Sequence, residues 1–288
     1  MNACTRALPL LALGLLCAAA PAWGGPPDPQ AFMAKLVPPP KDYAEAKTRC
    51  ANPKEKNSYL SRDPQDQALA DDVDKQTKTW ETAYTADMKA HVAQNMAASQ
   101  AAAMDPKQMM AMAQMQQAMV GRQMPPDPAA LADQLLRPLN DSTLSALQAN
   151  EQDQTKSGQS WLTKYNACGS LPIGAGGCQK MVEGKANAEA ADIGKKRGPI
   201  MEKYYSDLAV NWAKYRDGVQ KYLDAVTLKV PDGADPNGYQ VKILLNNNVA
   251  QRLAAVGTAA QNSAEAICPG FLYEAGQQYG GLCTGEGC

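Results

Sequence analysis

Apolar residues recur along most of this chain at the spacing of an α-helix. The clearest case follows Gly198-Pro199, where eight apolar positions are separated by steps of three or four residues. They are Met201, Tyr204, Leu208, Trp212, Tyr215, Val219, Tyr222 and Val226. Because such steps return to one face of a helix, this seam predicts a long helix whose apolar face packs against other helices.

A second long helix is predicted directly after the first. Residues 230–238 include two prolines and two glycines, a composition typical of a turn. Apolar steps of similar length then resume and end before Cys268-Pro269-Gly270. These positions are Val241, Leu245, Val249, Leu253, Val256, Ala260, Ala264 and Ile267. The two segments therefore predict an antiparallel helical hairpin.

Three Asp-Pro pairs upstream predict the starts of further helices, since proline fits the first turn of a helix. The pair at 63–64 opens a helix expected to run as far as Met104. The pair at 105–106 opens a helix that ends at the prolines of 124–126. The pair at 127–128 opens a short one.

Helices are also predicted on both sides of a loop flanked by cysteines at 168–178. Residues 142–165 have helical apolar spacing, and their polar middle, 151–160, either faces solvent or breaks the helix. Residues 179–197 are rich in alanine and charge and predict a weaker helix. A short helix is expected over 41–50.

Together these segments predict an all-α protein, an elongated bundle of long antiparallel helices built from helical hairpins. Residues 23–40, rich in proline and glycine, are expected to form an extended arm before the bundle. The bundle is assigned to 41–268, with 41–167 and 179–268 as candidate halves. Residues 269–288 form a tail rich in glycine and cysteine.

Residues 1–22 predict a secretory signal peptide. A positively charged start precedes an apolar run over 7–19, and residues 20–22, Ala-Pro-Ala, fit a cleavage site. Cys17 follows Leu16 instead of a small residue, so we do not expect a lipoprotein. The mature protein is expected in the periplasm or secreted, without a transmembrane segment.

The cysteines left after signal removal predict three disulfides, because an even number in an exported chain is typical of a disulfide framework. They are Cys50, Cys168, Cys178, Cys268, Cys283 and Cys288. Spacing favours Cys168–Cys178 across a turn, Cys283–Cys288 as a small terminal ring and Cys50–Cys268 as a long-range bridge. An alternative joins Cys268 to Cys283 and Cys50 to Cys288.

Charge and motifs narrow the classes of function. The chain has 28 basic and 29 acidic residues, a balance that argues against a nucleic-acid binder that works by phosphate neutralisation. It has one histidine and lacks the spaced motifs of zinc proteases, nucleotide-binding loops and dinucleotide-binding folds. No cofactor is therefore predicted, and the residues favour binding over catalysis.

Methionine is concentrated between positions 88 and 124. On a helix, Met109, Met112, Met115 and Met119 share one arc about 120° wide. Such a stripe is compatible with ordinary core packing, because methionine replaces leucine well on a buried helix face. We nevertheless select these four residues as the best candidate face for a protein partner, with a second copy of the chain as one such partner.

Two alternatives to a binding protein remain at this stage. Thioether ligands suit Cu(I), and a copper site would use Met88, His91, Met112, Met115 and Met119. A glycan hydrolase needs only two carboxylates in a cleft, and Glu274 is the acid with the most aromatic surroundings. The favoured interpretation is an exported helical binding or assembly protein that acts through protein–protein contacts.

Overall fold

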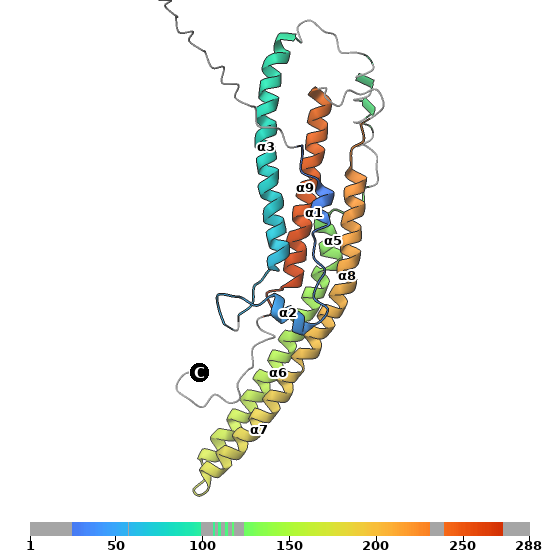
Figure 1. The fold of residues 1–288 in the computed structure, drawn as a ribbon. Helices are drawn as coiled ribbons and strands as arrows, with labels where there is room; N and C mark the ends of the chain where they lie inside the picture. Colours follow the sequence, from blue (N-terminus) through green and yellow to red (C-terminus); the bar gives the residue numbers. More distant parts are fainter. Residues whose placement is uncertain are drawn as a thin grey trace, which may run out of the picture.

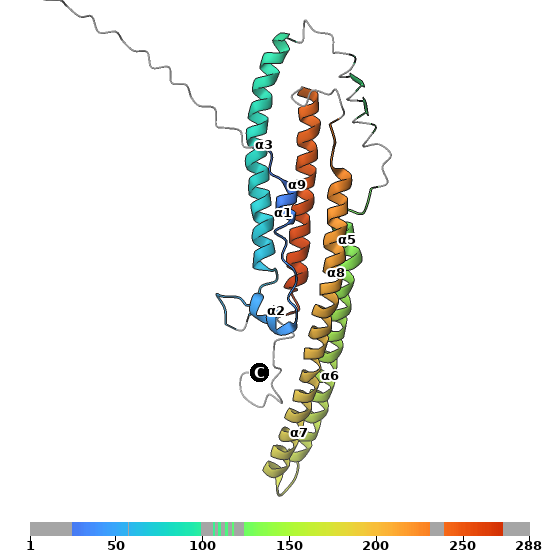
Figure 2. The same cartoon turned by 45° about the vertical axis from the view of Figure 1, so that its right-hand side comes forward.

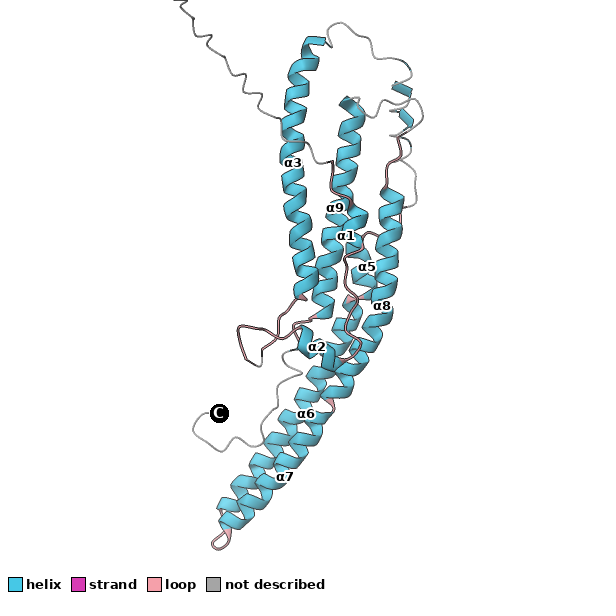
Figure 3. Ribbon diagram, viewed as in Figure 1, coloured by secondary structure: helices cyan, strands magenta, loops and turns pink. Residues whose placement is uncertain are grey.

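The computed structural model describes residues 25–56, 58–98, 124–230 and 239–272, together with 106, 109–110, 113–114 and 117. The named helices within them are α1 (Pro29–Met33), α2 (Tyr43–Arg49), α3 (Pro64–Ala98), α5 (Pro128–Leu135), α6 (Arg137–Gly169), α7 (Ala175–Lys195), α8 (Arg197–Val226) and α9 (Tyr239–Ile267). Figure 3 shows these residues as helices and loops, and one isolated bridge joins Ala51 to Tyr59. The predicted all-α class is confirmed.

The molecule is elongated, with a bundle at one end and a two-helix arm at the other. α3 and α9 lie side by side and run in opposite directions, next to α8 (Figures 1 and 2). α5 and α6 follow one another with only Leu136 between them, and only Lys196 separates α7 from α8. Two long antiparallel rods therefore run through the bundle, and their far halves continue beyond it as the α6–α7 hairpin.

Aspartate caps explain where several helices begin. The Asp63 carboxylate accepts the Asp66 backbone N–H at 3.0 Å at the start of α3, and Asp127 accepts the Ala130 N–H at 2.8 Å at the start of α5. Two of the three predicted Asp-Pro starts are thus confirmed. Of the helix predicted from 106, only six positions are described, and all six are helical.

The structure corrects the start of one predicted helix and leaves the end of another untested. α6 begins at Arg137, earlier than the predicted start at 142, and it is continuous through its polar middle, 151–160. Most of that middle is exposed, so its polar side chains face water and the helix does not need an apolar stripe there. α3 is described as far as Ala98, and the predicted end at Met104 lies outside the described residues.

The aromatic seam of α8 forms the centre of the core. Seven of its eight predicted positions are buried, and Tyr222 is half-buried. Tyr205 and Leu223, each one residue from the seam, are also fully buried because α8 is covered on more than one side. Gly218 allows α5 to approach, since a Cβ at this position would lie 2.9 Å from Leu131 Cδ1.

The N-terminal segment is not the fully extended arm that we predicted. Asp28 and Pro29 start the short helix α1, and Phe32, Met33 and Leu36 are buried in the main core. Leu36 follows Phe32 by four positions and Met33 by three, so the three side chains lie on one side of the segment, and α1 packs against α9. Burial of this face explains why the segment folds onto the bundle despite its prolines.

Helices from both candidate halves contribute to a single core. Leu69 and Val73 of α3 belong to the same buried cluster as Leu253 and Val256 of α9. Asn248 of α9 also donates to the Val226 carbonyl at 2.6 Å and accepts the Leu228 N–H at 3.1 Å. This amide fixes the C-terminal end of α8 against α9, in the hairpin that the sequence predicted.

The described residues contain two disulfides, and both are pairs that the cysteine spacing favoured. Cys50 and Cys268 are bonded at 1.99 Å and are 218 residues apart in the chain. Cys168 and Cys178 are bonded at 1.91 Å and are 10 residues apart. The first pair excludes the alternative pairing of Cys268 with Cys283. The third predicted pair, Cys283–Cys288, lies outside the described residues.

The two disulfides should differ in their effect on global stability. Chain-entropy arguments give a loss of about 5 kcal/mol for the 218-residue loop and about 3 kcal/mol for the 10-residue loop. We therefore expect Cys50→Ser/Cys268→Ser to have a lower urea midpoint than Cys168→Ser/Cys178→Ser, measured by helical circular dichroism. Equal midpoints, or the reverse order, would show that the long-range bridge does not hold the fold together.

Candidate functional site

Three described methionines of the 88–124 segment lie on the surface. Met109 and Met110 have exposed fractions of 53% and 64%, and Met124 is also exposed. Met109 belongs to the predicted partner face, whereas Met110 lies outside that face on the helix. Both side chains are exposed to solvent. The remaining members of that face, Met112, Met115 and Met119, lie outside the described residues.

The structure describes few of the residues that were predicted to bind copper. Met88 is half-buried on α3. The side chain of His91, like Met112, Met115 and Met119, is outside the part of the chain that the structure describes. Among the described residues, no group of three or more His, Cys, Asp or Glu side chains is arranged to hold a metal ion.

A second exposed apolar surface occurs at the end of the α6–α7 hairpin. We call residues 150–195 the arm and residues 168–178 its tip. Within the tip, Leu171 is 46% exposed and Ile173 is 91% exposed. The sequence pattern predicted only a connecting loop here. The apolar residues inside this turn, which is rich in proline and glycine, were the available signal for an exposed apolar surface.

The tip is held in a defined shape by local constraints. α6 ends at Gly169 and α7 begins at Ala175, so the chain reverses within five residues. Gly174 has a φ of +82°, a left-handed conformation that favours glycine, and the Cys168–Cys178 bond ties the two helix ends together. The apolar loop is therefore presented by a closed ring.

Polar contacts join the two helices of the arm. Glu189 of α7 accepts hydrogen bonds from Ser157 Oγ at 2.7 Å and Trp161 Nε1 at 2.9 Å on α6. These two bonds lower the pKa of the Glu189 carboxyl. Lys164 Nζ lies 3.8 Å from the centre of the Trp161 ring. The arm is thus stabilised by interhelical hydrogen bonds in addition to its narrow apolar contact.

At the base of the arm, a buried arginine fixes the junction of α7 and α8. Arg197 Nε donates to the side-chain oxygen of Asn150 at 3.1 Å, and the Asn150 amide donates to the Ile193 carbonyl at 2.9 Å. Arg197 and Asn150 are both buried. Since Asn150 belongs to α6, this pair locks α6 to the point where α7 passes into α8.

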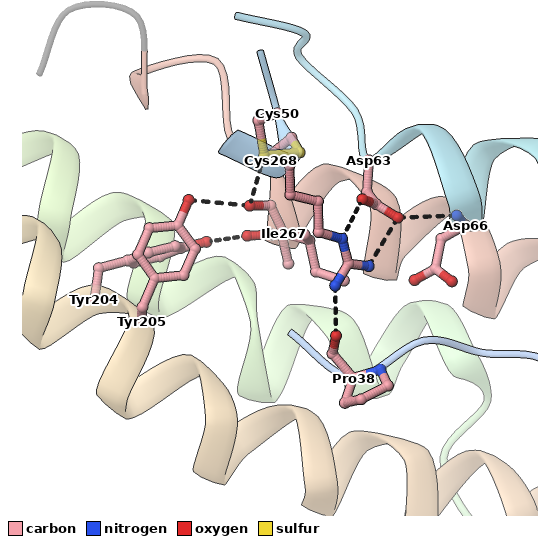
Figure 4. Close-up of a disulfide and its surroundings, with 10 residues drawn as sticks. Pro38, Cys50, Asp63, Asp66, Tyr204, Tyr205, Ile267 and Cys268 are labelled. Carbon is pink, nitrogen blue, oxygen red and sulfur yellow. Dashed lines mark hydrogen bonds and ion pairs between the residues drawn. A yellow bond between two sulfur atoms is a disulfide. The ribbon is translucent and has the colours of Figure 1, made fainter. Parts of the chain in front are cut away.

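A third feature is a buried network around the long-range disulfide, which we call the clamp. It comprises Arg49, Cys50, Asp63, Asp66, Ser263 and Cys268. Figure 4 labels Cys50, Asp63, Asp66 and Cys268. The Arg49 guanidinium binds both oxygens of the fully buried Asp63 carboxylate, at 2.6 and 3.0 Å. Its remaining nitrogen, Nη1, donates to the Pro38 carbonyl at 2.7 Å. One side chain therefore connects the N-terminal segment, α2 and α3.

Asp66 connects the same region to α8 and α9. Its carboxylate accepts the Val37 N–H at 3.1 Å and the Ser263 hydroxyl, while Ser263 Oγ accepts from Trp212 Nε1 at 2.7 Å. Burial raises the pKa of Asp66 above its ordinary value of 3.8, although these hydrogen bonds oppose the shift. The sequence predicted Asp63 as a helix start but gave no sign that Asp66 would be buried.

Two tyrosines secure the C-terminal end of α9. Tyr204 donates to the Ala266 carbonyl at 2.6 Å, and Tyr205 donates to the Ile267 carbonyl at 3.0 Å. Burial raises the pKa of both phenols, so both remain protonated donors. The carbonyls at a helix end have no partner within the helix, and these phenols supply one. The clamp and the tyrosines are thus structural groups whose named partners belong to the chain.

One surface hollow contains two carboxylates and is relevant to the hydrolase alternative. It has a volume of about 360 Å³ and is lined in part by Asp141 and Glu265. Glu265 pairs with Arg62 at 2.7 Å, and both acids are exposed to water. A glycosidase acid is normally shielded in an apolar pocket. Glu274, the acid singled out from the sequence, lies outside the described residues.

None of the helices in the described part of the chain is both long and apolar enough to cross a membrane. Comparison of the whole chain with protein-family models, curated proteins and solved structures finds no match. The surfaces and side chains described above are therefore the basis for inferring the function of the chain.

The raised pKa of Asp66 leads to a pH prediction. The folded state keeps the Asp66 proton to a higher pH than the unfolded chain, so ionisation of Asp66 opposes folding as pH rises from about 3.8 to the raised value. Asp66→Asn, which resembles the protonated acid, should therefore gain stability relative to the wild type across this window. Urea unfolding at a series of pH values measures the difference.

Asp71→Asn is the control for that series, because Asp71 is an exposed carboxylate on the same helix. It reports the effect of removing one negative charge from α3 at the surface. If the wild type instead gained stability relative to Asp66→Asn as pH rose, ionised Asp66 would stabilise the fold and our account of its burial would be wrong.

Proposed function

We propose that this chain is an exported binding or assembly protein that acts through protein–protein contacts. The observation that supports it is the exposure of Met109 and Met110, in the segment between α3 and α5. Met124, just before α5, is exposed as well. The partner covers this methionine surface, defined by the four predicted residues together with Met110 and Met124.

Methionine is suited to such a role. Its side chain is unbranched and polarisable, so it adapts to partner surfaces of different shape. Single exposed apolar residues are common on protein surfaces, but neighbouring ones are typical of contact sites. A partner that covers Met109 and Met110 removes two large side chains from water.

Export is supported by the signal-like sequence at 1–22 and by the two disulfides, Cys50–Cys268 and Cys168–Cys178. Disulfides form and persist in oxidising compartments such as the periplasm. The hydrogen bonds made by the buried polar side chains also fit a binding role. The partners named above for Arg49, Asp66 and Asn150 are groups of the chain itself.

Site-specific photo-crosslinking tests the methionine surface. A photo-reactive residue replaces Met109 or Met110 in the chain expressed in its native organism, and we expect one discrete adduct of higher mass. The control position is Val210, an exposed apolar residue on α8. An equal adduct at Val210, or none at Met109 and Met110, would contradict the proposal. An adduct of twice the chain mass would identify the partner as a second copy.

Metal binding separates the proposal from the copper alternative. The mature chain is titrated with Cu(I) in competition with a chromophoric chelator, and no retained metal is expected. If the wild type retained Cu(I) and the Met112→Leu/Met115→Leu/Met119→Leu variant did not, these methionines would form a copper site instead of a partner face. Glycan hydrolysis by the mature chain would favour the hydrolase alternative in the same way.

A further inference from the structure

The tip of the arm, at the opposite end of the molecule from the C-terminal end of α3, presents a different kind of surface (Figures 1 and 2). Leu171 and Ile173 project from its five-residue turn, with Ile173 almost fully in water. Folding buries isoleucine and leucine in preference to most residues, so their exposure on a ring closed by a disulfide is informative. The backbone conformation of this turn keeps the two apolar side chains exposed to water.

The apolar surface continues from the tip onto both helices of the arm. Leu162 of α6 and Met181 of α7 are exposed. Leu162 lies seven residues before the end of α6 and Met181 six residues after the start of α7, which places both about 10 Å along the helix axes from the tip. Exposed apolar side chains thus occur both in the loop of the tip and about 10 Å along the arm from it.

The charges near the tip are all of one sign. From residue 157 to residue 182 the chain contains two basic residues, Lys164 and Lys180, and no acidic one. Lys164 lies five residues before the end of α6, and Lys180 lies five residues after the start of α7. Both therefore sit about 7.5 Å along the arm from its end, one on each helix. The nearest acid on α7 is Glu183, further from the tip.

We propose that the tip binds the surface of a lipid bilayer that carries anionic headgroups. Leu171 and Ile173 enter the boundary between headgroups and acyl chains, while Lys164 and Lys180 lie at the level of the phosphates. Apolar side chains of interfacial proteins are buried about 5–10 Å into this boundary, which matches the distance between the loop and the lysines. Each lysine near an anionic surface adds attraction.

The shape of the tip favours a bilayer over a protein. A convex turn needs a concave socket on a protein partner, whereas a bilayer accepts a protruding apolar loop without one. The absence of acidic residues near the end of the arm complements an anionic surface. Since α7 has 21 residues, the arm would hold the bundle roughly 30 Å from the membrane. This proposal uses a different surface from the methionine contact and does not depend on it.

Vesicle flotation tests the proposal with the mature chain, residues 23–288. Vesicles of phosphatidylcholine alone are compared with vesicles that also contain about 30% phosphatidylglycerol. We expect binding to the anionic vesicles, weaker binding at high salt, and little binding to phosphatidylcholine. Leu171→Ser/Ile173→Ser should weaken binding about tenfold, because the inserted apolar area is lost. Lys180→Gln should weaken it mainly at low salt.

Matched controls separate the tip from the rest of the surface. Val210→Ser removes an exposed apolar residue from α8, and Lys214→Gln removes an exposed lysine there. Both should bind as the wild type does. All substituted residues are exposed, and circular dichroism checks that the variants remain helical.

A fluorescent reporter gives an independent readout. Ile173→Trp places an indole at the end of the loop, and its emission should shift to the blue with anionic vesicles as the ring leaves water. The proposal fails if the wild type does not float with anionic vesicles, or if the Leu171→Ser/Ile173→Ser variant floats equally well. Tip-dependent self-association or protein capture without flotation would also overturn it and would assign the tip to a protein socket.

Discussion

The fold depends most on how the end of α9 is fixed to the beginning of the chain. The Cys50–Cys268 bond is covalent, but the Arg49–Asp63 pair beside it determines how the surrounding segments fit. A buried carboxylate is tolerated only when its charge is paired and its oxygens accept hydrogen bonds. Asp63 meets this requirement with Arg49 and with the first turn of α3, so the N-terminal segment, α2, α3 and α9 must meet at one point.

The projecting arm is possible because the bundle is closed without it. α8 supplies the central seam, and α5, α9 and the near part of α6 pack against it, so the far parts of α6 and α7 are not needed for the core. A two-helix hairpin alone buries little apolar surface, and this one compensates with a disulfide at its tip and with Asn150 and Arg197 at its base. The arm is therefore a stiff extension of two core helices.

The two proposed contact surfaces differ in chemistry and in place. The sequence between α3 and α5 is rich in methionine, with Met109, Met110 and Met124 exposed, whereas the arm tip carries exposed leucine and isoleucine with lysines nearby. A protein contact at one end and a lipid contact at the other would make the chain a spacer that holds its partner at a set distance from a membrane. The rigidity of the rods between the ends gives that distance a defined value.

The sequence alone determined most of the helices, because their signals are local: apolar steps along α8 and α9, aspartate caps before Pro64 and Pro128, and prolines and glycines in the turns. It also favoured both described disulfides, since Cys168 and Cys178 flank a turn and the two locally favoured pairs leave Cys50 with Cys268. It did not indicate the clamp or the exposed tip. Asp66 and Ser263 are 197 residues apart, and nothing near either residue predicts their contact. Tertiary structure decided these features, because burial depends on which segments meet in space, whereas helix formation depends mainly on residues within a few turns.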